Sequence, residues 1–269
     1  LRLSHLLPQM ISFRNQRLWR AIRLLLLCIV LLTPLLLTGP LWTWKFSDLD
    51  LDTHWSRSSQ EAVQIPNAEA KEDEAVIQIY GARAYNWRGA FAVHTWIAIK
   101  EAGNPDFRRY DVIGWRHFRG MPVVSESSGL PNRAWFGNPP ELYGQVRDQE
   151  AEKLIRKVED AIASYPASEF YRVWPGPNSN TFTAHVLRQV PELKMTLPPT
   201  AIGKDFPLGF WIQPTTAGSG LQLTLWGILG ISIGIEEGLR FQWFALEFGL
   251  NPWKGEIYWP GIGTLHLWS

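Results

Sequence analysis

The chain begins with a long apolar segment. Residues 24–44 contain no charged side chain and are mostly leucine, which is long enough for a helix that crosses a bilayer. Arginines at positions 14, 17, 20 and 23 precede it, and such residues stay on the cytoplasmic side. We therefore expect a single-pass anchor in a bacterial inner membrane, with the following domain on the periplasmic side. A cleavable signal peptide is the alternative, although its apolar core is usually shorter.

The hydrophobic pattern divides the chain into four parts. Residues 1–44 form the cytoplasmic tail and the transmembrane anchor. Residues 45–74 are polar, without an apolar period, and are predicted to be a tether. Residues 75–205 alternate between strand-like and helix-like patterns and are predicted to form an α+β core. Residues 206–269 are predicted to form a β-rich extension.

The predicted α+β core begins with strand patterns. Residues 75–80 and 90–100 are both predicted strands, and the second is apolar on both faces. It is therefore expected to lie centrally in the sheet, buried on both sides. A turn at residues 103–106 leads into a further strand at residues 107–116, so these two strands should form an antiparallel hairpin. The small residues beside His94 suggest that a helix packs on the face that carries His94.

Two amphipathic helices follow. Residues 148–165 carry apolar side chains at i, i+3, i+4 and i+7. A β-type run at residues 169–174 and the break at Pro175, Gly176 and Pro177 then lead to a helix that starts at Ser179 and stops at Pro191.

Glycine-punctuated β-like runs occupy the C-terminal part of the chain. Residues 221–267 are expected to form three or four antiparallel strands. Within them, residues 221–235 are apolar but too short to span a membrane, so they are interpreted as strand. A second interfacial or membrane segment is the alternative interpretation.

Composition and motifs exclude several functions. The net charge of +1 gives no electrostatic footprint for nucleic acid. The only cysteine is Cys28, inside the apolar segment, so the rest of the chain has no thiol nucleophile, disulfide or cysteine zinc site. No HExxH, P-loop or dinucleotide-binding motif is present. We therefore expect no metal and no cofactor.

Ser179 is the first candidate for chemistry, because it stands where a predicted helix begins. Unpaired N–H groups and the positive end of the helix dipole favour a developing oxyanion at that point. The plain alternative is that Asn178 or Ser179 is only the N-cap of the helix.

His94 is the candidate base for this serine. His5 lies in the tail, His54 in the tether, and His185 points away from Ser179 on the same helix. His117 and His266 lie near strand ends without a link to the serine. Asp111, on the adjacent predicted strand, is the candidate third group that would orient the imidazole.

Short motifs carry a family resemblance. A strand with HTWIAI, a second strand, a helix and then NSNTF at the start of another helix resemble the circularly permuted papain-like proteins. These include the PPPDE and lecithin:retinol-acyltransferase-like groups and permuted relatives of NlpC/P60. The resemblance matches Asn178, Asn180, Thr181 and Phe182 to an NCNTF-like motif and His94 to the family histidine. It implies an antiparallel sheet or barrel packed on helices.

One departure from that family stands at the nucleophile, where Ser179 replaces cysteine. A hydroxyl is far less acidic than a thiol, so it needs a well-oriented base. The whole domain, with its PNSNTF and LPPTAIGKD motifs, also resembles an uncharacterised bacterial family of unknown function.

Three functions remain open from the sequence. The first is a membrane-anchored hydrolase or acyltransferase that acts on an amide or ester of the cell envelope, with Ser179, His94 and Asp111 as catalytic residues. The second is a catalytically inactive papain-like scaffold that binds an envelope peptide, lipid or protein. The predicted substrate-binding residues are Asn178, Asn180, Trp96 and Trp174, and in the inactive scaffold the groove would be formed by aromatic side chains such as Trp87, Trp96 and Trp174. The third is a structural domain in which Ser179 only caps a helix.

Overall fold

The computed structural model describes residues 6–51, 54, 56, 58–66 and 68–268. Residues 1–5 of the predicted tail and residues 52, 53, 55, 57 and 67 of the predicted tether lie outside the described residues. The chain divides into two compact units, Leu1–Thr38 and Gly39–Ser269.

The first unit is helical. Helix α1 (Leu6–Phe46) contains the stretch Ile22–Phe46, which is long and apolar enough to cross a membrane. The end of this helix, from Gly39 onwards, belongs to the second unit.

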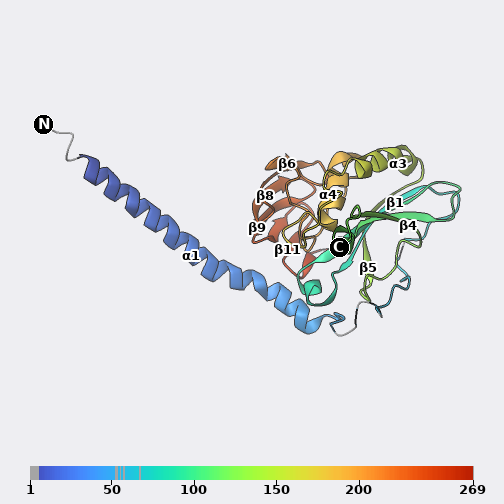
Figure 1. The fold of residues 1–269 in the computed structure, drawn as a ribbon, viewed down its shortest axis with the longest axis horizontal. Helices are drawn as coiled ribbons and strands as arrows, with labels where there is room; N and C mark the ends of the chain where they lie inside the picture. The colour runs from blue at the N-terminus through green and yellow to red at the C-terminus, as the bar shows by residue number, and fades with distance from the viewer. Residues whose placement is uncertain (1–5, 52–53, 55, 57, 67, 269) are drawn as a thin grey trace. The chain divides into compact units, whose positions relative to one another are not determined.

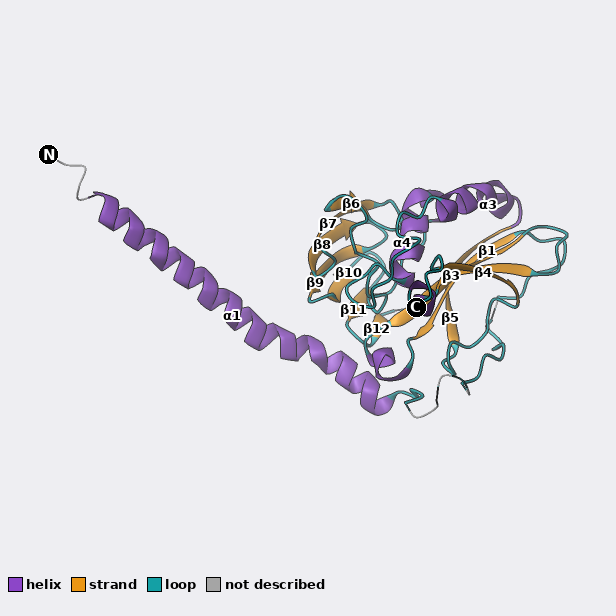
Figure 2. Cartoon of the chain, in the orientation of Figure 1, coloured by secondary structure: helices purple, strands orange, loops and turns teal. Residues whose placement is uncertain are grey.

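The second unit is a mixed α+β structure with two antiparallel sheets, as the hydrophobic pattern predicted (Figures 1 and 2). Its helical elements are η1 (Asn86–Ala90), α2 (Gly114–His117), α3 (Asp148–Ala163), α4 (Ser179–Gln189) and η2 (Pro191–Leu193). The first sheet has the order β4-β3-β2-β1-β5, with β1 (Val76–Arg83), β2 (Val93–Lys100), β3 (Phe107–Val112), β4 (Val124–Gly129) and β5 (Pro140–Arg147). The second sheet runs in sequential order from β6 (Ile212–Pro214) through β7 (Gly220–Leu225), β8 (Leu229–Gly234), β9 (Gly238–Trp243), β10 (Leu246–Asn251) and β11 (Glu256–Trp259) to β12 (Gly263–His266).

The main core lies between the first sheet and the two longer helices. Alternate residues of β2, including Val93, Ile97 and Ile99, pack against Phe182 and Val186 of α4. Strand β2 is central and fully buried, as predicted. The amphipathic pattern at residues 148–165 is confirmed by α3, whose apolar stripe is buried in the same core.

Helix α4 lies between the two sheets in Figure 1. One side packs on β2 and β3. From the other side, the Arg188 guanidinium donates to the carbonyl of Pro214 and to Gln222 of the second sheet. The second sheet is thus joined to the core through polar contacts.

Three details differ from the predictions. Residues 169–174, predicted as a β-type run, form no strand, because Tyr171 and its neighbours have no partner strand. Residues 221–267 form six strands, β7 to β12, where three or four were expected. Part of the predicted tether is folded onto the domain, since Val63 and Glu61 exchange backbone hydrogen bonds with Asn132 and Ala134.

Candidate functional site

The start of α4 is held by an elaborate cap at Asn178. Its Oδ1 accepts from the backbone N–H groups of Asn180 and Thr181, at 3.0 and 3.2 Å. Its Nδ2 donates to the carbonyls of Val173 and Ile202. The capping box is completed by Thr181, whose hydroxyl accepts from the Asn178 N–H. The side chain of Asn178 is therefore fully engaged within the protein.

Gly203 makes room for this cap. Its φ of +103° lies in the region that favours glycine, and a Cβ there would meet the Asn178 amide at 2.4 Å. A larger residue at this position would displace the cap.

Asn180 ties the helix to the sheet. Its Nδ2 donates to the carbonyls of Val93, at 2.9 Å, and Ile202, at 2.7 Å. Its Oδ1 accepts from the Thr95 hydroxyl at 3.0 Å. Asn178 and Asn180, both predicted to bind substrate, are buried and are used to position α4.

Thr95, not His94, is the residue of β2 that faces the start of α4. Its hydroxyl lies within hydrogen-bond distance of Asn180, Thr183 and the carbonyl of Ser179. Because successive strand residues point to opposite faces, His94 points to the other side of the sheet. Ser179 itself is only 5% exposed.

The structure therefore does not bring Ser179 and His94 together. No hydrogen bond joins them among the residues that the structure describes, and they lie on opposite sides of β2. The expectation that α4 packs beside His94 is corrected here: the helix packs on the more apolar face, with Val93, Ile97 and Ile99. That face buries more hydrocarbon, which favours it as the helix-packing surface.

His94 and Asp111 do lie together, on the face away from α4. The His94 Nε2 is 3.8 Å from the Asp111 Oδ2, too far for a hydrogen bond, and it is buried without a hydrogen-bond partner. The imidazole is stacked on Trp135, with ring centroids 3.6 Å apart and an interplanar angle of 5°. Trp135 covers the histidine from a loop between β4 and β5.

Arg109 is the true partner of Asp111. Its Nε and Nη2 donate to the Asp111 Oδ2 at 3.0 and 2.8 Å, and its guanidinium lies 4.0 Å from the Trp96 ring centroid. Arg109 is two residues from Asp111 on β3, so both side chains lie on the same face.

The pKa values of His94 and Asp111 are both lowered. Burial lowers the pKa of His94 despite the nearby Asp111, so the imidazole is neutral. Burial alone would raise the pKa of Asp111, but the charge and hydrogen bonds of Arg109 outweigh it, and the pKa stays below its usual value. Asp111 is therefore a carboxylate at neutral pH.

A pocket of about 330 Å³ opens beside this cluster. Its floor includes Arg109, Asp111 and the serines of β4, and its aromatic walls come from Trp115, Trp135 and Phe136. Arg133 also lines it and makes no side-chain hydrogen bond or ion pair with the described residues. The described lining of this pocket thus includes two guanidinium groups and one carboxylate.

A larger cavity of about 530 Å³ lies between the two sheets, and the Arg83 and Tyr258 side chains that line it already have partners. Arg83 donates to the carbonyls of Gly261 and Ile262, and the Tyr258 hydroxyl donates to Glu256. The pocket beside Arg109 is therefore the better ligand site.

The two predicted tryptophans differ in position. Trp96 is completely buried, stacks on Tyr80, and donates from Nε1 to the Pro131 carbonyl at 2.9 Å. Trp174 is 47% exposed in the loop before α4. The residues that line the pocket, Arg109, Arg133 and Trp135, were not predicted. The sequence offered a signal only for Arg109, which is two residues from Asp111 on a predicted strand and therefore shares its face.

Comparison with protein families matches part of the chain to a family model. Residues 74–206 match the model of DUF3750, described as a protein of unknown function. These residues form a DUF3750 domain. The DUF3750 domain contains the first sheet, α3 and α4, and it ends before β6. Searches among curated proteins and among solved structures gave no significant match.

The expected likeness to an uncharacterised family is confirmed by this match. The pocket, with Arg109, Asp111, Arg133 and Trp135, lies within the DUF3750 domain. Among the described residues, no group of three or more His, Cys, Asp and Glu side chains is arranged to hold a metal.

Proposed function

We propose that the chain is a membrane-anchored, catalytically inactive binding protein of the cell envelope. Its ligand site is the pocket lined by Arg109, Asp111, Arg133 and Trp135. The Arg133 guanidinium, which lines the pocket together with the Arg109–Asp111 pair and has no hydrogen-bond or ion-pair partner among the described residues, is the observation that carries this proposal.

The hydrolase or acyltransferase activity expected from the sequence requires Ser179 and His94 to lie close together, and they do not. A serine nucleophile needs a base within hydrogen-bond reach. The side chain that faces the Ser179 end of α4 is Thr95, which cannot act as a base near neutral pH. His94 lies across the sheet under Trp135. Binding therefore fits the geometry better than catalysis.

The chemistry of the pocket favours a small anionic ligand with a ring. Arg109 and Arg133 outnumber Asp111, so the described lining carries a net positive charge. Guanidinium groups bind carboxylate and phosphate through paired hydrogen bonds. Trp115, Trp135 and Phe136 offer flat apolar surfaces to a sugar or aromatic ring. A carboxylate-bearing envelope sugar fits both features.

We place the domain outside the cytoplasm, on the periplasmic side of a bacterial inner membrane. The apolar stretch of α1 serves as the single-pass anchor, and the four arginines before it hold the N-terminal tail in the cytoplasm.

We further propose a permuted papain-like ancestry for the core. An antiparallel sheet precedes α4, whose start packs against the central strand β2. In this proposal Ser179 replaces the nucleophilic cysteine, the matched histidine, His94, faces away from α4, and the binding pocket uses that opposite face of the sheet.

Substitution of Arg133 with glutamine should weaken ligand binding. N-acetylmuramic acid, which carries a carboxylate, is a suitable probe, measured by calorimetry on the detergent-solubilised chain. We expect a loss of roughly tenfold or more, since hydrogen bonds to charged groups contribute about 1.5–3 kcal/mol.

Two controls make this test specific. Arg156→Gln removes the same charge from the exposed face of α3, where Arg156 pairs only with Asp160, and should leave binding unchanged. N-acetylglucosamine, which lacks the carboxylate, should bind weakly to every variant. Equal binding of both sugars to the unaltered chain would refute the proposed site.

Ser179→Cys, in a Cys28→Ser background, should give an unreactive thiol. The side chain is buried and faces no base, so the reaction with a disulfide reagent should be slow until the protein unfolds. A fluorophosphonate probe should likewise fail to label Ser179 in the unaltered chain. Rapid modification of either would restore the case for catalysis.

A further inference from the structure

The second sheet buries its polar face and exposes its apolar face. Most antiparallel sheets bury an apolar face and expose a polar one. Here the buried face carries polar and charged side chains: Gln222, Thr224, Ser232, Arg240, Gln242, Glu247 and Asn251. The interior of the sheet is thus hydrophilic.

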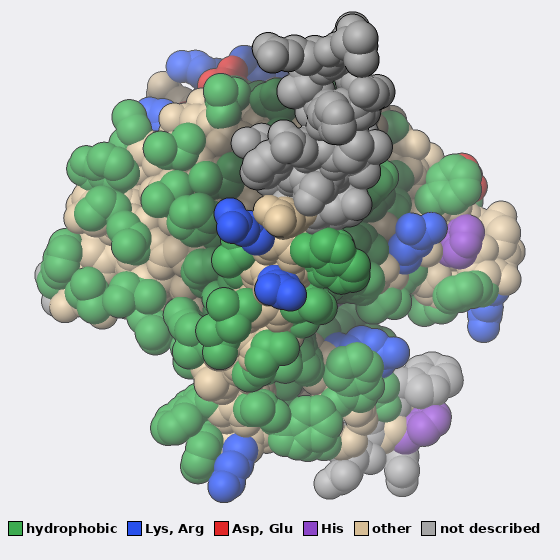
Figure 3. Space-filling model, turned by 90° about the vertical axis from the view of Figure 1, so that its left-hand side faces the viewer, with side chains coloured by type: hydrophobic (Ala, Val, Ile, Leu, Met, Phe, Trp, Pro, Cys, Tyr) green, Lys and Arg blue, Asp and Glu red, His purple; other side chains and the backbone are tan. Residues whose placement is uncertain are grey.

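The outward face is uniformly apolar. The strand register places twelve side chains from β7 to β10 in three rows: Leu225, Leu229, Trp243 and Leu246; Leu223, Ile231, Phe241 and Phe248; Leu221, Ile233, Leu239 and Leu250. We call these twelve residues the apolar grid. Those on β7 and β8 that are most open, such as Leu221 and Ile233, are 60% and 58% exposed. Figure 3 shows hydrophobic side chains spread over this side of the molecule, with few acidic ones.

Such a surface needs a partner, and contiguous exposed apolar patches mark interaction sites. Interfaces between proteins carry about one hydrogen bond per 100–200 Å², yet apart from the indole of Trp243 the apolar grid offers no polar side chain. Strands that face lipid show this same alternation, apolar outward and polar inward. The composition of the grid therefore matches hydrocarbon better than a protein surface.

Tryptophans border the grid at strand ends. Trp226 lies in the β7–β8 turn, Trp253 in the β10–β11 turn, Trp211 just before β6 and Trp268 after β12. All four are more than half exposed. Tryptophan is enriched where membranes meet water, because its ring is apolar and its N–H needs a polar partner.

The last turns of α1 reach this sheet within the second unit. The Thr43 hydroxyl donates to the Gly261 carbonyl at 3.0 Å, in the β11–β12 turn. A Cβ on Gly39 would clash with Pro260 in the same turn. The C-terminal end of α1, from Gly39 onwards, therefore lies beside the β11–β12 turn of the second sheet.

We propose that the apolar grid docks on the bilayer surface that α1 enters, with the bordering tryptophans at the headgroup level. This rests on the proposed membrane anchoring. The backbone groups of β7 to β11 are paired with neighbouring strands, so these strands can approach hydrocarbon without unsatisfied hydrogen bonds. Docking in this way would fix the DUF3750 domain close to the membrane.

Spin labels on the full chain in phosphatidylethanolamine and phosphatidylglycerol vesicles test this proposal. A label on native Cys28 reports the anchor. A label on Ile233→Cys, in a Cys28→Ser background, reports the grid, and Leu223→Cys provides a second position. Lys153→Cys on the exposed side of α3 is the water-facing control. The ratio of oxygen to nickel-chelate collisions should be several-fold higher at positions 233 and 223 than at position 153.

The labels at positions 28, 223 and 233 separate the possible failures. A lipid-exposed Cys28 with water-exposed positions 233 and 223 would overturn the docking and leave the anchor intact. Labels at 233 and 223 shielded from both reagents, with cross-links between copies, would replace the membrane with a second copy of the chain. Lipid exposure at 233 and 223 with Cys28 in water would refute the anchor, and with it the docking on a bilayer surface that α1 enters. If all three labels are in water, both proposals fail.

Discussion

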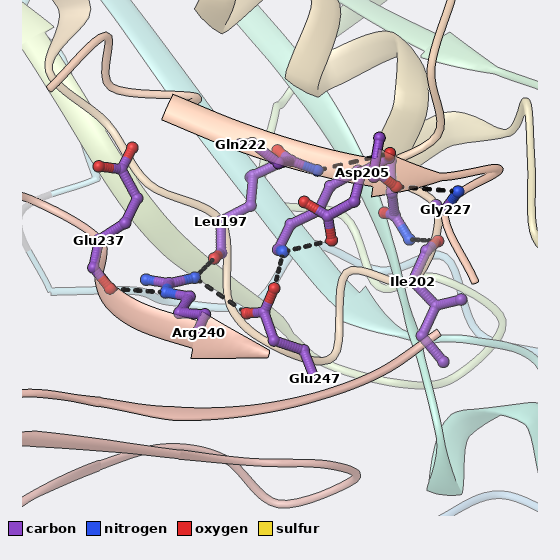
Figure 4. Close-up of polar contacts among 12 residues, drawn as sticks. Leu197, Ile202, Asp205, Gln222, Gly227, Glu237, Arg240 and Glu247 are labelled. Carbon is purple, nitrogen blue, oxygen red and sulfur yellow. Dashed lines mark hydrogen bonds and ion pairs between the residues drawn. The ribbon is translucent and has the colours of Figure 1, made fainter. Parts of the chain in front are cut away.

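Glu247→Ala should destabilise the protein by about 3–5 kcal/mol, the usual result of breaking a buried ion pair by removing one partner. The Glu247 carboxylate is 1% exposed and contacts two buried cations, the Lys204 ammonium and the Arg240 guanidinium (Figure 4). Lys204 also contacts Asp205, and Arg240 donates to the carbonyls of Leu197 and Glu237. Without Glu247, Lys204 would keep its ion pair with Asp205, whereas the buried Arg240 guanidinium would lose its carboxylate partner.

Denaturant unfolding of the detergent-solubilised chain, followed by tryptophan fluorescence, measures this loss. Glu236→Ala is the matched control, because Glu236 forms an ion pair with Lys254 in which both side chains are about one third exposed. Exposed pairs contribute only about 0–1 kcal/mol. If both variants lost the same stability, the buried network would not join the second sheet to the core.

The stability that Glu247 contributes should be lost as the pH falls. Burial alone would raise the pKa of Glu247, but Lys204 and Arg240 outweigh it and hold the pKa below its usual value. A carboxyl group with a lowered folded pKa contributes stability above its unfolded pKa and loses it as the pH falls through the folded one. The difference in unfolding free energy between the unaltered chain and Glu247→Ala should therefore be constant near neutral pH. It should become smaller only in acid, as the pH falls below the usual pKa of a glutamate.

Strongly periodic segments were predictable from the sequence. The apolar stripe at residues 148–165 became α3, and the doubly apolar run at residues 90–100 became the central strand β2. Strand β5 was missed because it begins at Pro140, directly after Pro139, and two successive prolines indicate a break in the chain. The hydrogen bonds between Val63 and Asn132 were equally invisible, since backbone pairing of irregular segments leaves no periodic pattern.

The expected Ser179–His94 pair depended on which face of β2 meets α4. Both faces of β2 are apolar, so alternation groups His94 with Trp96 and Thr95 with Ile97 without showing which pair meets α4. The sequence favoured the face with small residues, whereas the helix packs on Val93 and Ile97. Proximity of His94 to Asp111 could be predicted, because β2 and β3 are consecutive antiparallel strands. The covering residue Trp135 could not, because it comes from an irregular loop.

Trp96→Ala should cost about 3–5 kcal/mol, as expected for removing a fully buried aromatic side chain. The indole stacks on Tyr80, supports the Arg109 guanidinium and bonds the Pro131 carbonyl. Its loss would leave a cavity and an unpaired buried carbonyl. It would also release the loop that carries Arg133 and Trp135, so ligand binding should fall together with stability.

Trp174→Ala separates this structural role from a direct role in binding. Trp174 was predicted to contact substrate in the same way as Trp96, but it is half exposed in the loop before α4, so its removal should change stability by less than about 0.5 kcal/mol. Trp96→Phe should have an intermediate effect, because it keeps most of the packing and loses only the bond to Pro131. If Trp96→Ala instead weakened binding without loss of stability, the indole would contact the ligand directly. The pocket would then have to extend beneath Trp135 to the buried nitrogen of His94.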